Sequence, residues 1–355
     1  MTRYSRQTVL SEIGEEGQNK LKKSSVLCIG AGGLGSPILL YLVAAGVGHI
    51  GIVEFDVVDI SNLQRQILFN TQDIGKPKAH CAKNHLHLLN PDVQIEIFPE
   101  GLNEQNAEHL FRQYDIILDG TDNFETKYLI NDTAHKCAKP WIFGAIQGFD
   151  GQVSVFDTHT GPCYRCLYPA PPKTPIQNCA EFGVIGAVAG LIGITQAMQA
   201  LQLIIKHTSF EPLIGKLWTI DTRTMHTHVY SIQKRADCSV CSKEAHHITL
   251  NYASPVCGII HELTPEQISM RQPNAILIDV REQEEWDEGH IEDAILIPLS
   301  ELRAGKIPAL DTNIEIILYC QRGIRSKQAA AILRGEGYLN TYSMSGGYEE
   351  WLNIF

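Results

Sequence analysis

Apolar and polar residues in the first two thirds of the chain form short apolar runs separated by longer amphipathic stretches. The apolar runs predict strands at residues 25–30, 49–56, 93–98 and 114–120. The amphipathic stretches predict helices at residues 5–22, 36–45 and 76–90. Strands that alternate with helices of this length favour βαβ units and a parallel, doubly wound α/β sheet. Later strands of antiparallel type are expected at residues 151–157 and 215–221.

A second alternation of apolar runs begins after residue 270. It predicts strands at 275–280 and 315–320 and a helix at 326–334, which indicates a second, smaller α/β domain. The segment after Cys241 is polar and has no strong period, as is typical of a linker. The predicted organisation is a first domain over residues 1–245, a linker over 246–254 and a second domain over 255–355.

Composition and charge narrow the class of protein. Of the 355 residues, 44% are hydrophobic and 19% are charged, as in a folded globular protein. The net charge of −11 argues against a nucleic-acid binder, which needs a basic face. Residues 250–355 carry −8 of this charge, which agrees with a boundary near residue 250. The N-terminus lacks the apolar core of a secretory signal, so a cytoplasmic protein is expected.

One apolar segment, residues 184–205, carries no formal charge and is long enough to span a membrane. Gln196, Gln199 and Gln202 fall three apart in it and form a polar stripe, and its small residues suit close helix packing. We therefore expect a buried helix or a helix at a subunit interface, and no membrane span. Since no export signal is present, the ten cysteines are expected as metal ligands, catalytic groups or buried thiols.

A glycine-rich turn, in the stretch VLCIGAGGLGSP, follows the first predicted strand. Gly30, Gly32 and Gly35 fit the pattern G-x-G-x-x-G, and Gly33 adds a fourth glycine. Glycines let backbone N–H groups approach a phosphate, and the helix N-terminus that follows adds partial positive charge. Asp56, after the second predicted strand, is placed to bind ribose hydroxyls. These residues alone leave NAD, ATP and a turn without a ligand open.

Two polar groups further along the chain favour a triphosphate over NAD. The segment VVDISNLQRQ carries Asn62, Arg65 and Gln66. A fixed guanidinium suits a triphosphate because the phosphate charge must be offset before a carboxylate attacks the α-phosphorus. Lys76 and Lys78 open the next predicted helix and add positive charge, unless they are solvated surface lysines.

Two carboxylates in the stretch LDGTDN stand at the end of a buried strand, where α/β sheets carry their ligands. These are Asp119 and Asp122. A carboxylate at this position can hold Mg²⁺ on pyrophosphate oxygens. Asp122 can also cap the helix that follows, and one residue can serve both purposes.

The stretches RYSRQ, GAGGLG, FDVVDISNLQRQ, GKPK and DGTDN together resemble the MoeB/ThiF family, relatives of the adenylating domains of ubiquitin-activating enzymes. The resemblance covers roughly residues 3–245 and implies that Mg-ATP is used to adenylate the C-terminal glycine of a ubiquitin-like sulfur carrier ending in Gly-Gly. It implies that Arg65 and Lys78 bind phosphates, that Asp122 holds magnesium and that Asp56 binds ribose. It also implies a homodimer in which Arg6 reaches the ATP of the neighbouring subunit.

Two C-x-x-C pairs, CYRC and CSVC, supply Cys163 and Cys166 and then Cys238 and Cys241. Each pair puts two sulfurs on one turn, and four thiolates make a tetrahedral zinc site of structural type. Redox chemistry is the competing interpretation, but two matched pairs in a reducing compartment favour zinc. The MoeB resemblance includes such a zinc.

Cys179 follows a Pro-rich stretch, YPAPPKTP, that is expected to form a loop. A free cysteine is often a small buried hydrophobe. In the family that the chain resembles, this segment is a mobile crossover loop near the adenylate, and its cysteine takes part in transfer in only some members. A catalytic role and a buried thiol therefore both stay open for Cys179.

In the stretch YCQRGIRS, Cys320 lies at the end of a predicted strand and begins a short loop that leads into a predicted helix. Backbone N–H groups around the sulfur, Arg322 and Arg325 nearby, and the helix N-terminus favour a thiolate or a persulfide. This loop, with LIDVREQEEWDEGHIEDAILIP and SGGYEEW, resembles the rhodanese family over roughly residues 250–355. The resemblance implies that Cys320 carries sulfur as a persulfide and that Asp279 and Arg281 are structural.

The two halves together predict an enzyme that is both adenylyltransferase and sulfurtransferase, with ATP, Mg²⁺ and Zn²⁺. A Cys320 persulfide attacks the acyl-adenylate, and reductive cleavage by a thiol such as Cys179 frees a thiocarboxylate. The sulfur comes from a persulfide donor such as a cysteine desulfurase or from thiosulfate. The pathway stays open among molybdenum cofactor, thiamine and tRNA thiolation.

Three alternatives stay open. One is an adenylating enzyme of the same superfamily that acts on another carboxylate or on a tRNA base, which leaves the rhodanese-like half unexplained. The others are an NAD-dependent oxidoreductase and a non-catalytic nucleotide-binding scaffold that carries a rhodanese. Exchange of pyrophosphate into ATP that depends on a Gly-Gly-ended carrier separates these from the main prediction.

Overall fold

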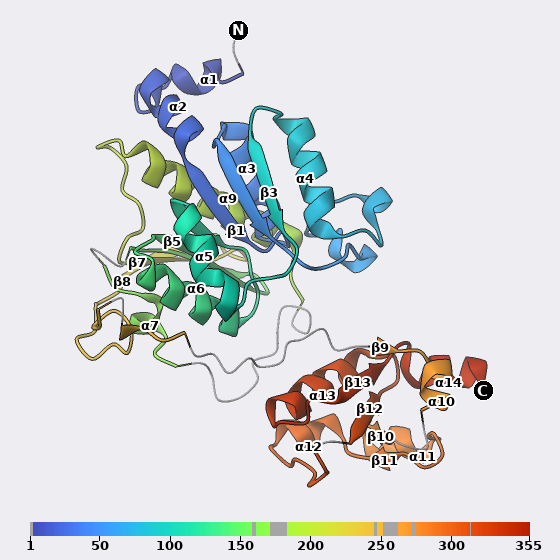
Figure 1. Ribbon diagram of the computed structural model, residues 1–355. Helices are drawn as coiled ribbons and strands as arrows, with labels where there is room; N and C mark the ends of the chain where they lie inside the picture. The colour runs from blue at the N-terminus through green and yellow to red at the C-terminus, as the bar shows by residue number, and fades with distance from the viewer. Residues whose placement is uncertain are drawn as a thin grey trace. The chain divides into compact units, whose positions relative to one another are not determined.

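The chain is built on two sheets, and the computed structural model in Figure 1 describes residues 3–157, 161–170, 183–244, 247–250, 262–271, 275–312 and 314–355. It divides into two compact units, Met1–Asn251 and Tyr252–Phe355, each with an apolar core of its own. We call these unit 1 and unit 2. Cys179 lies outside the described residues.

The larger sheet, in unit 1, has the strand order β3-β2-β1-β4-β5-β6-β7-β8. The parallel strands are β1 Ser25–Ile29, β2 His49–Val53, β3 Gln94–Phe98, β4 Ile116–Asp119 and β5 Trp141–Gln147. The strands that pair antiparallel beyond them are β6 Asp150–Phe156, β7 Lys216–Asp221 and β8 His226–Ser231. The predicted doubly wound α/β sheet is therefore confirmed, with its strands close to the expected limits.

Helices cover both faces of this sheet, with α5 and α6 on one face and α3 and α9 on the other (Figure 1). The helices are α1 Ser5–Thr8, α2 Gly14–Lys23, α3 Gly35–Ala45, α4 Lys78–Leu89, α5 Glu104–Gln113, α6 Phe124–Lys136, α7 Tyr164–Leu167 and α9 Gly186–Ile205. Two short 3-10 helices are η1 Ile60–Asn62 and η2 Thr71–Asp73. The single helix predicted over residues 5–22 is two helices, because turns at residues 9–13 interrupt it and Gly14 takes a φ of +54°.

The long apolar segment forms α9, which passes a membrane-span test by length and composition only. It packs so closely on α3 that a Cβ at Gly193 would lie 2.5 Å from the Leu34 carbonyl oxygen. Gln196 and Gln199 are buried, and the Gln196 Nε2 donates to backbone carbonyls at the end of β4 and in β5. These two glutamines face the interior, so α9 is a core helix of unit 1.

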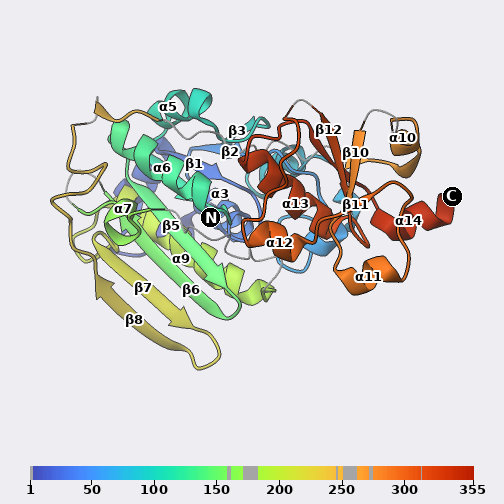
Figure 2. The same cartoon turned by 90° about the horizontal axis from the view of Figure 1, so that it is seen from below.

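The smaller sheet, in unit 2, is parallel throughout and has the order β11-β10-β12-β13-β9. Its strands are β9 Glu262–Leu263, β10 Ala275–Asp279, β11 Ile295–Leu296, β12 Glu315–Tyr319 and β13 Thr341–Met344. Its helices are α10 Pro265–Ser269, α11 Gln283–Asp287, α12 Leu299–Arg303, α13 Ile324–Gly335 and α14 Gly347–Ile354. Apolar clusters join α12 and α13 to one face of the sheet and α10 and α14 to the other (Figure 2).

Candidate functional site

The order of the larger sheet creates a switch point at the carboxyl ends of β1 and β4, the place where open α/β sheets bind their ligands. The backbones of the two turns touch there: the Gly120 N–H donates to the Ile29 carbonyl over 2.8 Å. A Cβ at Gly30 would lie 2.9 Å from the Gly120 oxygen, and a Cβ at Gly120 would lie 2.7 Å from the Gly30 oxygen. Both positions therefore require glycine.

The glycines of the predicted phosphate turn have different roles. Gly30 has a φ of +90°, and a Cβ at Gly35 would lie only 2.0 Å from the Gly30 carbonyl oxygen. These two glycines shape the turn against the start of α3. A Cβ at Gly32 would keep an ordinary distance, 3.6 Å, from Gln66 Nε2. Gly32 therefore lies on the open side of the turn, where its missing side chain leaves room.

Arg65 and Gln66 lie against this turn, although they are distant from it in sequence. A Cβ at Gly33 would lie 3.6 Å from Arg65 Cγ, and Arg65 Nη1 donates to a backbone carbonyl of η1 over 3.0 Å. Gln66 is 5% exposed, and its Oε1 accepts no hydrogen bond from the described residues. Asn62 uses its Oδ1 to cap η1. A buried carbonyl oxygen without a partner beside such a turn fits contact with a ligand.

Glu54 is a residue that the sequence interpretation missed. It directly follows β2 and is buried, and its two carboxylate oxygens accept the N–H groups of Ala31 and Asp56 at 2.8 and 2.9 Å. Glu54 thereby ties the glycine turn to the segment that carries Asp56. The stretch VEFD contains two acidic residues, Glu54 and Asp56, and the sequence interpretation gives a role only to Asp56.

Asp56 and Lys78 are brought together by an antiparallel bridge between Val57 and Pro77. Lys78 Nζ lies 3.0 Å from Asp56 Oδ2; the lysine side chain is 4% exposed and the aspartate side chain 57% exposed. Lys76, by contrast, is exposed. Lys78 is thus a buried cation whose carboxylate partner faces solvent, whereas Lys76 fits the surface interpretation.

Asp119, at the end of β4, is fully buried and engaged within the protein. Its Oδ1 accepts from the Thr121 N–H and hydroxyl, and its Oδ2 lies 2.6 Å from Lys127 Nζ. Lys127 also donates to the carbonyl oxygens of Thr121 and Gly144, at 2.9 and 3.0 Å. This buried ion pair, which the sequence interpretation missed, holds the turn after β4 to the neighbouring strand β5.

Asp122 lies on that turn and is exposed. The cap of α6 is Asn123, whose Oδ1 accepts from the Thr126 N–H over 2.8 Å. The alternative that Asp122 caps the helix is therefore wrong, because the residue next to it does so. Asp122 is thus exposed on a turn that the hydrogen bonds of Asp119 and Lys127 with Thr121 fix in place.

Arg6 is exposed on α1, and the residues around it anchor this short helix. The Tyr4 hydroxyl accepts from Asn90 Nδ2 over 2.8 Å, and the Tyr4 ring packs where a Cβ at Gly46 would stand. Gln7 Nε2 donates to Gln18 Oε1 over 2.7 Å. Contacts of Tyr4 and Gln7 with the rest of unit 1 thus fix the helix, and Arg6 lies on its exposed side.

The four cysteines of the two C-x-x-C pairs converge, and their sulfurs all lie within 4.8 Å of one another. The distance is 3.5 Å between the sulfurs of Cys163 and Cys238 and 3.4 Å between those of Cys166 and Cys241. Zinc–sulfur bonds of about 2.3 Å in a tetrahedron place sulfurs about 3.8 Å apart. The donor set and its spacing therefore fit zinc.

The charges of this cysteine cluster also fit a cation. Burial and the nearby Cys238 raise the pKa of Cys163 to about 12, and burial and the nearby Cys163 raise the pKa of Cys241 above its usual value. Burial acts in the same direction on Cys238, but the backbone N–H groups of Val240 and Cys241 hold its pKa below the ordinary value. Packed thiols resist deprotonation together unless a divalent ion offsets their charge.

The helix α6 holds the cysteine cluster in place. The Tyr164 N–H donates to Asn131 Oδ1 over 2.8 Å, and Arg165 forms a bidentate ion pair with Asp132. Both acceptors lie on α6, and both donors lie on α7, between Cys163 and Cys166. The helix that begins just after Asp122 therefore also fastens two of the four sulfur ligands.

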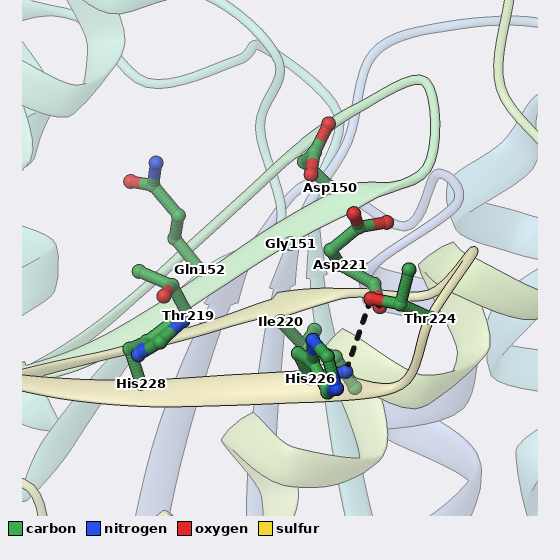
Figure 3. A pocket seen from close by; sticks show the side chains of 9 residues that line it. All are labelled: Asp150, Gly151, Gln152, Thr219, Ile220, Asp221, Thr224, His226 and His228. Atoms are coloured by element: carbon green, nitrogen blue, oxygen red, sulfur yellow. Dashed lines mark hydrogen bonds between the residues drawn. The ribbon is translucent and has the colours of Figure 1, made fainter.

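A separate hollow lies on the antiparallel strands β6, β7 and β8 (Figure 3). Its lining includes Asp150, Asp221, His226 and His228, and it contains none of the predicted site residues. Arg223 pairs with both aspartates, at 3.3 and 2.8 Å. One arginine therefore bridges the two carboxylates and offsets half of their charge, and among the described residues only the four cysteines form a group that could hold a metal ion.

In unit 2, Cys320 follows β12 directly and is 1% exposed. Its Sγ lies 3.7 Å from Ser326 Oγ, which in turn lies 2.8 Å from Ser343 Oγ. A Cβ at Gly347 would lie 2.3 Å from the Cys320 carbonyl oxygen. Gly323 takes a φ of +84° just before α13. The loop after Cys320 is thus folded tightly between a helix start and a glycine turn.

The arginines of this loop differ from expectation, because a carboxylate offsets each of them. Arg325 forms two hydrogen bonds with Glu285, at 2.6 and 2.5 Å, and Arg322 Nε lies 3.0 Å from both oxygens of Glu349. The hydrogen bond from Arg325 holds the pKa of Glu285 below its usual range, and the same bond raises the pKa of Arg325. The loop is therefore shaped by ion pairs, and it offers less free positive charge than its sequence indicates.

Asp279 and Arg281 form a buried ion pair at 2.7 Å, as expected of structural residues. Arg281 Nη2 also donates to the Gly289 carbonyl over 2.7 Å, and Nη1 donates to Gln321 Oε1 over 3.1 Å. The pair thus joins the segment that contains GHI to the residue after Cys320.

Comparisons with known proteins agree with both halves. The chain matches the ThiF family over residues 4–240 and the rhodanese-like domain over residues 266–354. A probable adenylyltransferase/sulfurtransferase MoeZ of Mycobacterium tuberculosis is 38% identical over 370 residues, which cover 99% of this chain and 92% of that protein. A sulfur carrier protein adenylyltransferase of Thermus thermophilus is 44% identical over 265 residues, 73% of this chain and 97% of that protein.

Two further likenesses complete this picture. Adenylyltransferase and sulfurtransferase MOCS3 of Culex quinquefasciatus is 34% identical over 99% of this chain and 87% of that protein. The crystal structure of E. coli MccB with MccA-N7isoASN has a TM-score of 0.61 at 22% identity, covers 68% of this chain and 74% of that one, and shares the fold. The chain therefore belongs to the ThiF family, carries a rhodanese-like domain, and is an adenylyltransferase and sulfurtransferase.

Proposed function

We propose that unit 1 binds Mg-ATP at the glycine turn and adenylates the C-terminal glycine of a ubiquitin-like sulfur carrier ending in Gly-Gly. The observation that carries this proposal is that Arg65 and Gln66 meet the turn while Lys78 meets Asp56 at the carboxyl edge of the same sheet. The Thermus thermophilus relative is named for a sulfur carrier protein, which supports this class of substrate.

In the first step, an oxygen of the carrier's carboxylate attacks the α-phosphorus, the bond to the bridging oxygen breaks, and pyrophosphate leaves. Arg65 and Lys78 offset the phosphate charge, and Asp56 binds the ribose. Asn62 and Gln66 complete the nucleotide site. Magnesium held by Asp122 would supply further positive charge on the phosphates.

Two further features belong to this proposal. The cysteine cluster holds a structural Zn²⁺, which its spacing supports. The enzyme is a homodimer in which Arg6 reaches the nucleotide of the partner, and the outward position of Arg6 on an anchored helix supports this. The domain limits 1–245 and 255–355, the linker 246–254 and a cytoplasmic location stay predictions.

In the second step, the terminal sulfur of a Cys320 persulfide attacks the acyl carbon of the adenylate, and AMP leaves. The product is an acyl disulfide between the carrier and Cys320. A second thiolate, for which Cys179 is the candidate, attacks the Cys320 sulfur, so that a disulfide forms and the carrier leaves as a thiocarboxylate. An external thiol then reduces this disulfide.

Variants in the two units separate the two steps. We expect Arg65→Ala to lower carrier-dependent ATP–pyrophosphate exchange by about 10²–10³-fold, since it removes charge compensation at the phosphates, and to leave persulfide formation on Cys320 unchanged. We expect Cys320→Ala to keep the exchange and to lose thiocarboxylate formation, followed by mass spectrometry of the carrier.

Each of the two steps has a result that would contradict it. Absence of exchange with every Gly-Gly-ended carrier would overturn the adenylation proposal. Unchanged thiocarboxylate formation in Cys320→Ala would remove Cys320 from the mechanism.

A further inference from the structure

The positive charge of the Cys320 loop is matched by carboxylates from two other elements. Arg325 and Glu285 of α11 are bound through two parallel hydrogen bonds, and their side chains are 33% and 32% exposed. Arg322 pairs with Glu349 of α14, and these side chains are 74% and 43% exposed. The Arg325 pair is therefore bidentate and only partly exposed, whereas the Arg322 pair is more open to solvent and weaker.

The charged groups beside the loop follow the same pattern. Arg281 and Lys327 each pair with a carboxylate, at 2.7 and 2.8 Å. Glu284, next to Glu285 on α11, is exposed and meets no cation among the described residues. The segment 250–355 as a whole has a net charge of −8. The surroundings of Cys320 are thus neutral to negative.

Two classes of sulfur donor make different demands on such a loop. Thiosulfate is a small dianion, so its approach to Cys320 needs cations that are free to bind it. A persulfide on the cysteine of a donor protein is brought to Cys320 by contacts between the two proteins. The bidentate Glu285–Arg325 pair is compatible with the second class and opposes the first.

We propose that Glu285 is a positioning residue that sets donor specificity: by holding the Arg325 guanidinium, it excludes small anionic donors such as thiosulfate and leaves Cys320 to a protein-borne persulfide. The proposal rests on the role of Cys320 proposed above. With a protein donor, the Cys320 thiolate attacks the outer sulfur, the donor's S–S bond breaks, and the donor cysteine leaves as a thiolate. With thiosulfate the same attack releases sulfite, so both reactions are balanced without an external oxidant or reductant.

The test compares Glu285→Gln with Glu284→Gln in the full chain. Glutamine keeps the size of the side chain and removes its charge, so Glu285→Gln leaves the positive charge of Arg325 without a carboxylate partner. Thiosulfate:cyanide sulfurtransfer is measured as thiocyanate, and we expect Glu285→Gln to raise kcat/KM by about tenfold, mainly through a lower KM. The matched change Glu284→Gln should stay within about twofold, because Glu284 holds no arginine. Transfer from a cysteine desulfurase charged with cysteine should stay within about twofold in Glu284→Gln and should not rise in Glu285→Gln.

Four variants decide the proposal. An unchanged KM for thiosulfate in Glu285→Gln overturns it, and so does an equal gain in Glu284→Gln, since bulk charge would then be the cause. The double variant Glu285→Gln/Arg325→Gln must lose the gain if Arg325 carries it. If Cys320→Ala retains thiosulfate:cyanide activity, the proposed role of Cys320 is wrong. If the activity requires Cys320 but Glu285→Gln does not change it, only the inference on Glu285 is wrong.

Discussion

Both units end a buried parallel strand in a short turn that leads into a helix, yet the cations beside the two turns differ in how they are paired with carboxylates. In unit 1, Arg65 meets no carboxylate among the described residues, and the buried Lys78 shares a carboxylate that faces solvent. In unit 2, Glu285 and Glu349 hold both arginines of the turn. One cation beside the nucleotide turn, Arg65, is thus without a carboxylate, whereas both arginines of the Cys320 turn are paired.

This difference follows from what each turn is proposed to hold. A triphosphate brings several negative charges, so its site needs more positive charge than its own carboxylates offset, and Arg65 supplies this. A sulfur on Cys320 is held by a covalent bond, so its turn needs a defined shape more than a surplus of charge. In unit 1 the buried Asp119–Lys127 pair fixes the turn after β4, and in unit 2 the Glu285–Arg325 pair engages an arginine that follows Cys320.

Among the changes that test this comparison, Lys127→Met is expected to have the largest effect, which is on the free energy of unfolding of unit 1. The change leaves the fully buried Asp119 carboxylate without its cation, which costs about 3–5 kcal/mol. Urea unfolding of unit 1 should move by this amount, and unfolding of unit 2 should not. The control is Lys136→Met on the same helix, whose partly exposed pair with Glu108 is worth less than about 1 kcal/mol. A cost as small as the control's would show that the turn in unit 1 does not depend on the buried pair.

Gly35→Ala and Gly32→Ala form the second test, because they separate the shape of the glycine turn from its ligand. A Cβ at Gly35 would overlap the Gly30 carbonyl, so we expect a loss of about 1–3 kcal/mol in thermal unfolding. Gly32→Ala has room and should keep stability within about 0.5 kcal/mol, but it should weaken ATP binding by crowding the phosphates. Undiminished ATP binding in Gly32→Ala, measured by calorimetry, would contradict the placement of the phosphates.

The smallest expected effect is the pH dependence of the Glu285–Arg325 pair. The hydrogen bond from Arg325 lowers the pKa of Glu285 in the folded protein. The stability from this pair is therefore fully present above the unfolded pKa of glutamate, about 4.3, and is lost as the pH falls through the lower folded value. For a partly exposed pair the change is less than about 1 kcal/mol. Unit 2 of Glu285→Gln should lack this part of the acid dependence in thermal unfolding; identical profiles would show that the pair is not stabilising.

Much of the fold could be predicted from the sequence because its signals are local. Apolar runs and amphipathic stretches located the central strands and α3, α4, α9 and α13. The break between α1 and α2 was missed, since it depends on backbone turns at residues 9–13 that no strong signal marks. The cap of α6 was assigned to Asp122 as an alternative, and the neighbouring Asn123 makes the hydrogen bond.

The sequence by itself determined the features that are written in short stretches of the chain: the glycine pattern, the two C-x-x-C pairs and the Cys320 loop. It also determined the order of these motifs. The tertiary structure alone decided which charges meet. Glu54 reaches back to Ala31, Lys127 reaches Asp119 and Gly144, and Glu285 holds Arg325 from 40 residues away in sequence. The physical reason is that the partner of a charged side chain is a neighbour in space. Sheet order and helix packing determine which residues become such neighbours.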